Sequence, residues 1–314
     1  MKHKNYILNE LHEIIDPTML SSLMFRIIGL TLPSQSYARY KYIFRYLHYR
    51  RKIKPLLHTR IGVKNPILFS IVHLNAPDFL ILALKSIRTL YPDVHLLVLD
   101  NGSRYTLLKS VLRLCRKYKC TLLYNTSMYK DHVLAIQYLI DYSISLGKRF
   151  TIILDNDVVL ISPIDEILEI MQKKNLIIAG PHDLIKFNGK YFRYAPLAVH
   201  ASLLILRPVD TITSAGKYCS FNYIITKYSR TPEPYHSLSY TCLGRILYLK
   251  PLMLKDLFPL TAYMFNDKIV GYHAWYSSRI RIHGKNNLDS LNIEFLKQQH
   301  KRIKEFLIDK IRSL

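Results

Sequence analysis

Two aspartates flank an asparagine in the stretch TIILDNDVVLI, at Asp155, Asn156 and Asp157. The apolar runs on either side are β-branched and too short for a membrane span, so they predict a buried strand that breaks at the polar triplet and then resumes. Burying two unpaired carboxylates would be costly, so we expect them at the carboxyl end of the strand, facing a crevice. Their oxygens could bind a divalent cation, and the cation could bind phosphate. A solvated turn is the alternative interpretation of the triplet alone.

The region around this triplet alternates strand and helix patterns. Strands are predicted at 67–74, 95–100, 120–125 and 150–155, helices between them at 79–90, 107–118 and 133–146, and further strands at 176–180 and 200–206. This rhythm predicts an α/β, Rossmann-like fold, with a mostly parallel central sheet and helices on both faces.

Polar residues follow each of the first four predicted strands. They are His73, Asn75, Asp100, Asn125 and the triplet Asp155 to Asp157. The carboxyl edge of an open α/β sheet is where a nucleotide binds, so we expect a nucleotide site there. Asp100 precedes Asn-Gly and is also typical of an Asx turn, which is a purely structural alternative.

Two common phosphate-binding motifs are missing from the sequence. No GxGxxG follows the first predicted strand, and GxxxxGK[ST] does not occur. The dinucleotide-binding fold and the P-loop are therefore disfavoured. A bound phosphate would need another source of positive charge, for which a metal on Asp155 and Asp157 is the natural candidate, assisted by Lys130 or Arg279.

The composition favours anionic partners. The chain has 314 residues and a net charge of +23, from 45 Lys and Arg against 22 Asp and Glu. This balance fits phosphorylated ligands, an anionic membrane surface or nucleic acid. The four cysteines form no CxxC pair and no signal peptide is recognisable, so we expect a cytoplasmic protein without structural zinc, either in solution or peripheral on a membrane.

Three segments differ in composition, and we predict boundaries at 1–64, 65–285 and 286–314. The first holds a basic, aromatic run at 37–60 without any acid. In that run Tyr40, Phe44, Leu47 and Arg51 recur at helical spacing. This helix could lie on anionic lipid, or it could pack on the central domain with its cations solvated.

The last segment predicts an amphipathic helix at 291–314. Its apolar stripe consists of Leu296, Ile303, Leu307, Ile311 and Leu314. Such a helix usually packs on its own domain, and docking to a membrane or a partner is the alternative.

The ordered series IVHLNAPDFLILALKSI, VLDNGS, KDHVLAIQYLI and ILDNDVVLI resembles the nucleotide-sugar glycosyltransferases of the GT-A fold, particularly the family 2-like group. The resemblance covers about 67–161, and a weaker match continues through HASLLILR (200–207) to GYHAWYSSR (271–279). It implies a glycosyltransferase that moves a sugar from a nucleoside-diphosphate donor, with a UDP-sugar favoured, to a hydroxyl on a glycan, a lipid-linked acceptor or a protein. It also implies dependence on Mn²⁺ or Mg²⁺ through a DXD motif, here Asp155-Asn156-Asp157.

The resemblance also implies roles for individual residues. Nucleotide binding falls to His73, Asn75, Asp100, Lys130, His132, Asn156 and Arg279, and metal binding falls to Asp155, Asp157 and His273. Within these sets Asp100 would contact the base, and Asp155 would approach the ribose or a metal-bound water. Simpler interpretations exist for three of them: a hydrogen-bonded aromatic cluster for His273, a helix start for His132 and a solvated loop charge for Lys130.

The acceptor base departs from the pattern. Inverting members of the group supply an Asp or Glu after a late strand, but the corresponding stretch SLSYTCLGRIL (237–247) contains no carboxylate. Weak candidates nearby are Asp183, Glu233 and His236. The base could be one of these, the alignment could be shifted, the reaction could be retaining, or the protein could be an inactive homologue.

Other classes of protein compete with this prediction. A sugar nucleotidyltransferase shares the sheet and the metal, but it would need a Gly-rich basic loop after the first strand, which HLNAPDF does not provide. A nucleic-acid-binding protein fits the charge but not the motifs, because no helix-turn-helix or RNP-like pattern occurs. A membrane-surface scaffold without catalysis is the third alternative. Oligomeric state and sugar identity are not indicated.

Overall fold

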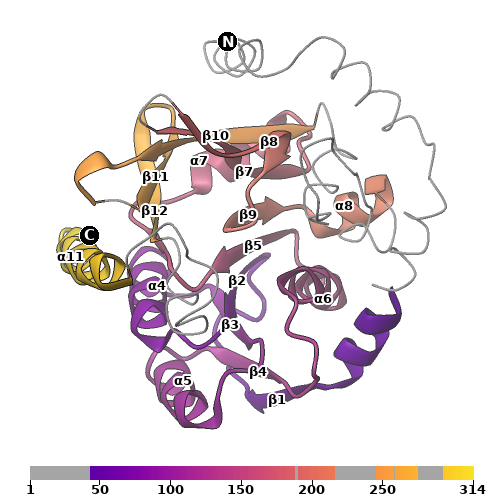
Figure 1. The fold of residues 1–314 in the computed structure, drawn as a ribbon. Helices are drawn as coiled ribbons and strands as arrows, with labels where there is room; N and C mark the ends of the chain where they lie inside the picture. The colour runs from indigo at the N-terminus through magenta and orange to yellow at the C-terminus, as the bar shows by residue number, and fades with distance from the viewer. Residues whose placement is uncertain (1–42, 188–189, 216–244, 258, 275–292) are drawn as a thin grey trace.

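Four parallel strands form the centre of the sheet in the order β4–β3–β2–β5 (Figure 1). The computed structural model describes residues 43–187, 190–215, 245–257, 259–274 and 293–314. The central strands are β2 (Ile67–His73), β3 (His95–Asp100), β4 (Thr121–Asn125) and β5 (Phe150–Asp155), and the helices between them are α4 (Pro77–Leu90), α5 (Tyr105–Lys117) and α6 (His132–Ser145). These elements confirm the predicted βαβαβαβ order and the α/β class.

Each central strand contributes side chains to two separate cores. Ile71 and Val98 pack in the cluster that includes α4 and α5, whereas Leu97 and Ile153 pack in the cluster that includes α6. Successive side chains of a strand point to opposite faces, so near-continuous apolar runs are what a sheet covered on both sides requires. Figure 1 shows α4 and α5 on one face and α6 on the other.

Beyond this centre the pairing is mainly antiparallel. The outer strands are β7 (Ile178–Phe187), β8 (Lys190–Val199), β9 (Leu203–Leu206) and β10 (Ile246–Met253), with α7 (Asp165–Lys173) and α8 (Pro208–Ala215) between them. Strand β9 runs antiparallel to β5 and β7, and among the described strands only β10 with β7 adds another parallel pair. The predicted mostly parallel central sheet is therefore confirmed in β2 to β5, and the strands added around it pair mainly antiparallel.

A hairpin of two strands not predicted from the sequence, β11 (Leu260–Phe265) and β12 (Lys268–Ala274), extends the sheet. Its turn residues Asn266 and Asp267 both have positive φ, 46° and 61°. Two such residues are typical of a type I′ turn, so the Asn-Asp pair was the available sequence signal. Strand β12 then pairs with β6 (Val158–Leu160), which places His273 opposite Val158, directly after the DXD triplet.

The basic N-terminal run is only partly helical. Residues 43–51 are helical, and β1 (Ile53–Leu57) follows and pairs antiparallel with β4. The residues that recur at helical spacing do not face the core, because Phe44 is 72% exposed whereas Tyr46 and Tyr49 are fully buried. Tyr40 lies outside the described residues. The helix rests on the core through its tyrosines, which leaves Phe44 and its basic neighbours facing outward.

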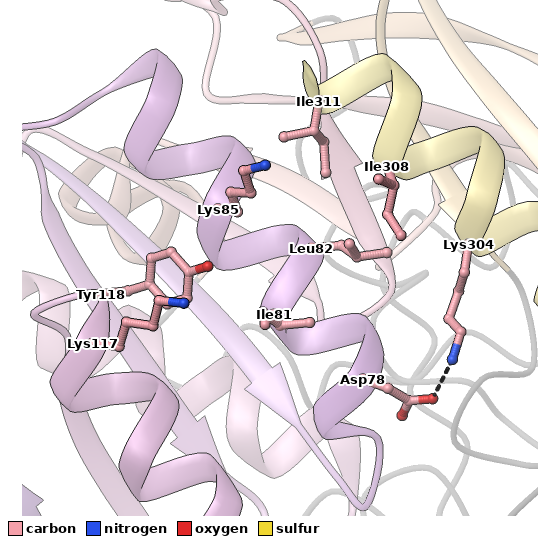
Figure 2. Close-up of a pocket in the computed structure, with 9 residues that line it drawn as sticks. All are labelled: Asp78, Ile81, Leu82, Lys85, Lys117, Tyr118, Lys304, Ile308 and Ile311. Carbon is pink, nitrogen blue, oxygen red and sulfur yellow. Dashed lines mark hydrogen bonds and ion pairs between the residues drawn. The ribbon is translucent and has the colours of Figure 1, made fainter. Parts of the chain in front are cut away.

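The C-terminal helix α11 (Ile293–Arg312) packs beside α4 (Figure 1). Ile303, Leu307 and Ile311 of the predicted stripe are buried, and Leu314 is exposed. The side chain of Leu296 lies outside the described residues. Between α4, α11 and the end of α5 lies a groove of about 440 Å³, with an apolar floor, lysines around it and an ion pair between Lys304 and Asp78 at 3.0 Å (Figure 2). No described helix combines the length and apolar character that crossing a membrane requires.

Candidate functional site

The polar strand ends meet at one edge of the sheet, as predicted. His73 at the end of β2 is in register with Asp100 at the end of β3, and the preceding Val72 is in register with Asp155 at the end of β5. Because these strands are parallel, their carboxyl ends open onto the same side. The alignment collects side chains from distant parts of the sequence at one site.

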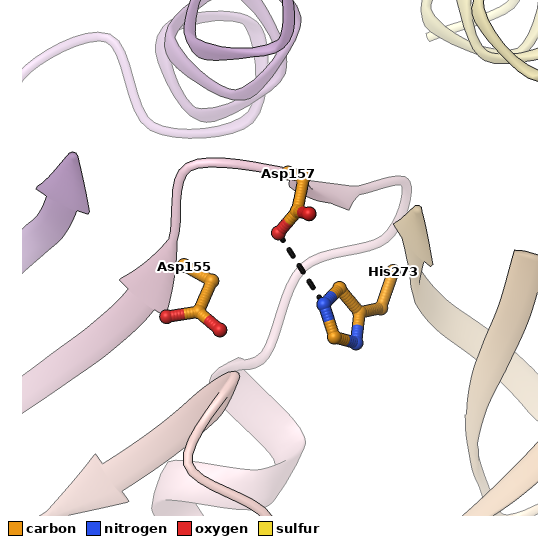
Figure 3. Close-up of side chains that lie close together, drawn as sticks. All are labelled: Asp155, Asp157 and His273. Carbon is orange, nitrogen blue, oxygen red and sulfur yellow. Dashed lines mark ion pairs between the residues drawn. The ribbon is translucent and has the colours of Figure 1, made fainter. Parts of the chain in front are cut away.

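Asp155, Asp157 and His273 form the chemically most informative cluster (Figure 3). One potential ligand atom from each lies within 4.8 Å of the others, and Nε2 of His273 is 3.3 Å from Oδ1 of Asp157. Ligand atoms on opposite sides of Mg²⁺ are about 4.2 Å apart, so a shift of less than an ångström would close the cluster around a cation. The two carboxylates supply the oxygen ligands that Mn²⁺ and Mg²⁺ prefer, and the imidazole favours Mn²⁺ over Mg²⁺.

Burial differs among the three side chains of this cluster. Asp157 and His273 are buried, whereas Asp155 is partly exposed. A buried carboxylate needs a compensating positive charge or hydrogen bonds, which a cation at this position would supply. The exposed part of Asp155 leaves one side of the cluster accessible to a ligand.

His132, the first residue of α6, contacts the opposite side of Asp155. Its Nε2 lies 2.8 Å from Oδ1 of Asp155. Burial lowers the pKa of His132, but the charge of Asp155, the hydrogen bond to it and the charge of Asp157 together raise the pKa above its ordinary value. A histidine in this position orients the carboxylate, which is how outer groups fix the ligands of a metal site.

Asn156 occupies the turn between the two aspartates and is buried. Its Nδ2 atom has no hydrogen-bond partner among the described residues. A buried amide nitrogen in this state costs about 1–3 kcal/mol, and such groups occur at functional sites. The amide is therefore available to a ligand that enters the site.

Asp100 and His73 lie beneath the site rather than on its surface. Both side chains are fully buried, and Nε2 of His73 lies 3.9 Å from Oδ2 of Asp100. Oδ1 of Asp100 accepts hydrogen bonds from the backbone N–H groups of Gly102, at 3.1 Å, and Ser103, at 2.7 Å. Burial raises the pKa of Asp100 to about 6, against the effect of these hydrogen bonds. The Asx-turn alternative fits Asp100 better than direct base contact, because contact would require the turn to open.

Asn75 and Lys130 hold the neighbouring loops. Asn75 has a positive φ of 55°, and its N–H donates to Oγ of Ser103 at 2.9 Å. Nζ of Lys130 donates to the carbonyl of Gly102 at 2.7 Å, so it lies within the loop rather than in solvent. Both side chains lie next to the turn that Asp100 stabilises, on the side where the nucleoside was predicted.

Asn101 is the centre of a network that the sequence did not reveal. Its Oδ1 accepts from the hydroxyl of Tyr49 at 2.8 Å and from Nδ2 of Asn125 at 3.1 Å, while its own Nδ2 donates to the carbonyl of Lys130 at 2.9 Å. Tyr49 is 52 residues away in sequence, and no spacing pattern predicts that contact. The network ties the 43–51 helix to the loops that follow β3 and β4.

The remaining candidates cannot be placed at the site. Glu233, His236 and Arg279 lie outside the described residues. Asp183 lies on β7, and its side chain is also outside the described set.

Comparisons with known proteins give only distant likenesses. No protein-family profile matches the sequence, and no curated protein matches it. Among solved structures, the glycosyltransferase GlyE of Streptococcus pneumoniae TIGR4 is 12% identical, with a TM-score of 0.40 over 61% of this chain and 46% of GlyE. The galactosyltransferase LgtC, solved with donor and acceptor sugar analogues, is 12% identical, with a TM-score of 0.38 over 58% of this chain and 72% of LgtC.

The mannosyltransferase PcManGT of Pyrobaculum calidifontis, solved with GDP-Man and Mn²⁺, is 13% identical, with a TM-score of 0.43 over 93% of this chain and 85% of PcManGT. All three are glycosyltransferases. The chain spans less than half of GlyE.

Proposed function

We propose that this protein is a metal-dependent glycosyltransferase of the GT-A type, which uses a nucleoside-diphosphate sugar as donor and a hydroxyl group as acceptor. The observation that carries the proposal is the convergence of Asp155, Asp157 and His273 at the carboxyl edge of the parallel strands. Two of these residues belong to the predicted DXD motif. The third lies more than 100 residues further along the chain, so a chance meeting of three potential metal ligands at this edge is a poor explanation.

Each residue of the cluster has a proposed role in binding the cation. Asp157 and His273 would hold the cation from the buried side, and Asp155 would contribute from the exposed side, oriented by His132. When bound, the cation would neutralise the diphosphate and stabilise the charge that develops on the leaving nucleotide. Lys130 and Asn75 keep the adjacent loop in shape for the nucleoside through Gly102 and Ser103.

The finer parts of the proposal concern the substrates. We favour a UDP-sugar among donors, and a glycan, lipid-linked molecule or protein as the acceptor, on the basis of the sequence resemblance alone. The domain boundaries at 64 and 285 and the attachment of the basic N-terminal segment to an anionic membrane are likewise our proposals. A sugar nucleotidyltransferase is distinguishable by its products, since it would release pyrophosphate from a nucleoside triphosphate and a sugar phosphate.

The decisive experiment measures release of nucleoside diphosphate from UDP-, GDP- and dTDP-sugars with Mn²⁺ or with EDTA. We expect the parent protein to turn over at least one donor only with the metal. Asp157→Asn should lower kcat/KM by at least about 100-fold. Loss of a residue that only hydrogen-bonds to a metal ligand costs up to about 100-fold, and loss of a ligand should cost at least as much.

The matched control for this experiment is Glu169→Gln, which neutralises an exposed carboxylate on α7. It should behave as the parent. If Asp157→Asn retained full metal-dependent turnover, or if no donor were bound or hydrolysed under any condition, the proposal would be wrong.

A further inference from the structure

Behind His273 lies a continuous line of buried polar groups that no sequence motif indicated. Nδ1 of His273 is 2.8 Å from the hydroxyl of Tyr263, which is 2.6 Å from Oγ of Ser202, which is 2.8 Å from Nδ1 of His200. None of these four side chains belongs to a residue more than 7% exposed. Water therefore has little access to the line, and its hydrogen bonds must be satisfied within the protein.

The strands explain how these groups meet. Tyr263 on β11 is paired with Gly271 on β12, which makes it the diagonal neighbour of His273. Gly271 is needed there, because a Cβ at this position would lie 2.8 Å from the carbonyl oxygen of Val159 on β6. Ser202 precedes β9, and its carbonyl oxygen accepts the N–H of Asp155 at 2.9 Å. The line is therefore connected to two members of the candidate metal site, to His273 through Tyr263 and to the backbone of Asp155 through Ser202.

A backbone group sets the direction of the hydrogen bonds. The N–H of Ser202 donates to Nδ1 of His200 at 3.2 Å. A backbone N–H cannot act as an acceptor, so Nδ1 of His200 carries no proton in the neutral ring. The contact between that nitrogen and Oγ of Ser202 must then be a hydrogen bond donated by the serine hydroxyl.

The donor and acceptor of each remaining hydrogen bond can then be assigned in turn, because each hydroxyl has a single hydrogen to donate. Since Ser202 donates to His200, its oxygen accepts from the hydroxyl of Tyr263. Since Tyr263 donates to Ser202, its oxygen accepts from Nδ1–H of His273. Neutral His273 then carries its proton on Nδ1, and the lone pair of Nε2 faces Oδ1 of Asp157 at 3.3 Å.

We propose that His200, Ser202 and Tyr263 form a positioning relay that fixes His273 in the tautomer that binds a cation. Two acceptors that face each other at this distance repel, and a cation between them removes the repulsion. The relay thus keeps Nε2 of His273 unprotonated and able to bind a metal in the metal-free protein. This inference rests on the proposed function, because it assigns a role to residues that support the same metal site.

The first test is a titration of the donor-free protein with Mn²⁺, followed by the electron paramagnetic resonance signal of the unbound ion. Tyr263→Phe should weaken Mn²⁺ binding by about 10- to 100-fold, as is typical when a ligand loses its outer hydrogen-bond partner. Ser202→Ala should weaken it in the same direction by a smaller factor. Tyr272→Phe, a buried tyrosine on the same hairpin that packs against Phe306, should bind Mn²⁺ as the parent does.

The titration also separates this inference from the proposed function. Normal binding by both relay variants together with lost binding by Asp157→Asn would overturn the relay and leave the metal site intact. Normal binding by Asp157→Asn as well would refute the metal site itself. Circular dichroism of each variant confirms that a loss does not reflect unfolding.

The second test measures the tautomers in the parent protein. ¹⁵N NMR of the metal-free parent protein, with His200→Gln and His273→Gln used to assign the ring signals, reports which nitrogen of each ring carries the proton. We expect opposite tautomers, with the proton on Nδ1 of His273 and on Nε2 of His200. A proton on Nε2 of neutral His273 would overturn the relay.

Discussion

Buried hydroxyl and amide groups hold several residues of this site in place, alongside the charged contacts of His132 and Lys130. Tyr263 orients a candidate metal ligand from below, and Tyr49 supports Asn101 in the loop next to the predicted nucleoside pocket. Hydroxyls suit this role because each can accept one hydrogen bond and donate another, so the direction of a network is passed along it. Charged partners would carry a larger desolvation cost at the same depth.

Tyr49→Phe tests this view at the residue scale. Removal of the hydroxyl takes one of two donors from Oδ1 of Asn101, so we expect the free energy of unfolding to fall by about 1 kcal/mol. The midpoint of urea unfolding should fall while the slope stays constant. Tyr105→Phe, at a position that is 71% exposed, is the control and should leave the midpoint unchanged. A Tyr49→Phe midpoint equal to that of the parent would show that the contact does not stabilise the fold.

At the scale of elements, neighbouring strands share buried polar residues as well as apolar ones. His95 is the first residue of β3, and Thr121 is the first residue of β4. Nε2 of His95 lies 3.3 Å from Oγ1 of Thr121. Burial, with contributions from Lys148 and Arg88, lowers the pKa of His95 to about 4. The neutral ring is therefore part of the folded sheet, and its protonation opposes folding.

The pH dependence of unfolding follows from this shift. Above about pH 6.5 the ring is neutral in both states, so its contribution to stability is complete. As the pH falls towards 4, the unfolded chain binds a proton that the folded chain does not, and stability is lost. Relative to His95→Gln, which does not titrate, the parent should lose about 2 kcal/mol between pH 7 and pH 5.

Urea unfolding of the two proteins at both pH values measures this difference. His58→Gln, which changes an exposed histidine, should keep the pH dependence of the parent. If the free energy of unfolding fell equally in the parent and in His95→Gln between pH 7 and pH 5, the assignment to His95 would be wrong.

At the scale of the whole molecule, the net charge is +23, and some of the basic side chains lie near an aromatic side chain that faces outward. Phe44 is 72% exposed, and the nearby Arg50, Arg51 and Lys52 are exposed as well. A basic surface with an exposed aromatic ring favours the proposed contact with an anionic membrane.

Flotation with phosphatidylserine-containing vesicles checks this proposal on the full chain. Each basic side chain near such a surface contributes about 1 kcal/mol, so Arg50→Glu with Arg51→Glu should reduce the floated fraction at low salt by at least about 10-fold. High salt should release the parent protein. Lys173→Glu with Lys174→Glu makes the same charge change at the C-terminal end of α7 and should float as the parent does. Absence of flotation by the parent, or equal loss in both variants, would reject a role for this surface.

The sequence by itself determined the parallel centre of the fold and the polar residues at its edge. Alternation of apolar runs with amphipathic stretches is a local property, so β3 and β5 fall at their predicted residues, and the register then brings Asp155 beside Val72. The strand pattern also predicted that the DXD triplet would sit at a strand end.

Only the tertiary structure decided which distant residues complete the site. His273 reaches Asp157 because the β11–β12 hairpin pairs with β6, and Tyr263 reaches His273 through the register of that hairpin. It also decided that Tyr46 and Tyr49, rather than Phe44, face the core. Contacts between residues far apart in the chain depend on strand pairing and on which helix face finds a partner, and these are properties of the assembled sheet that no short window of sequence contains.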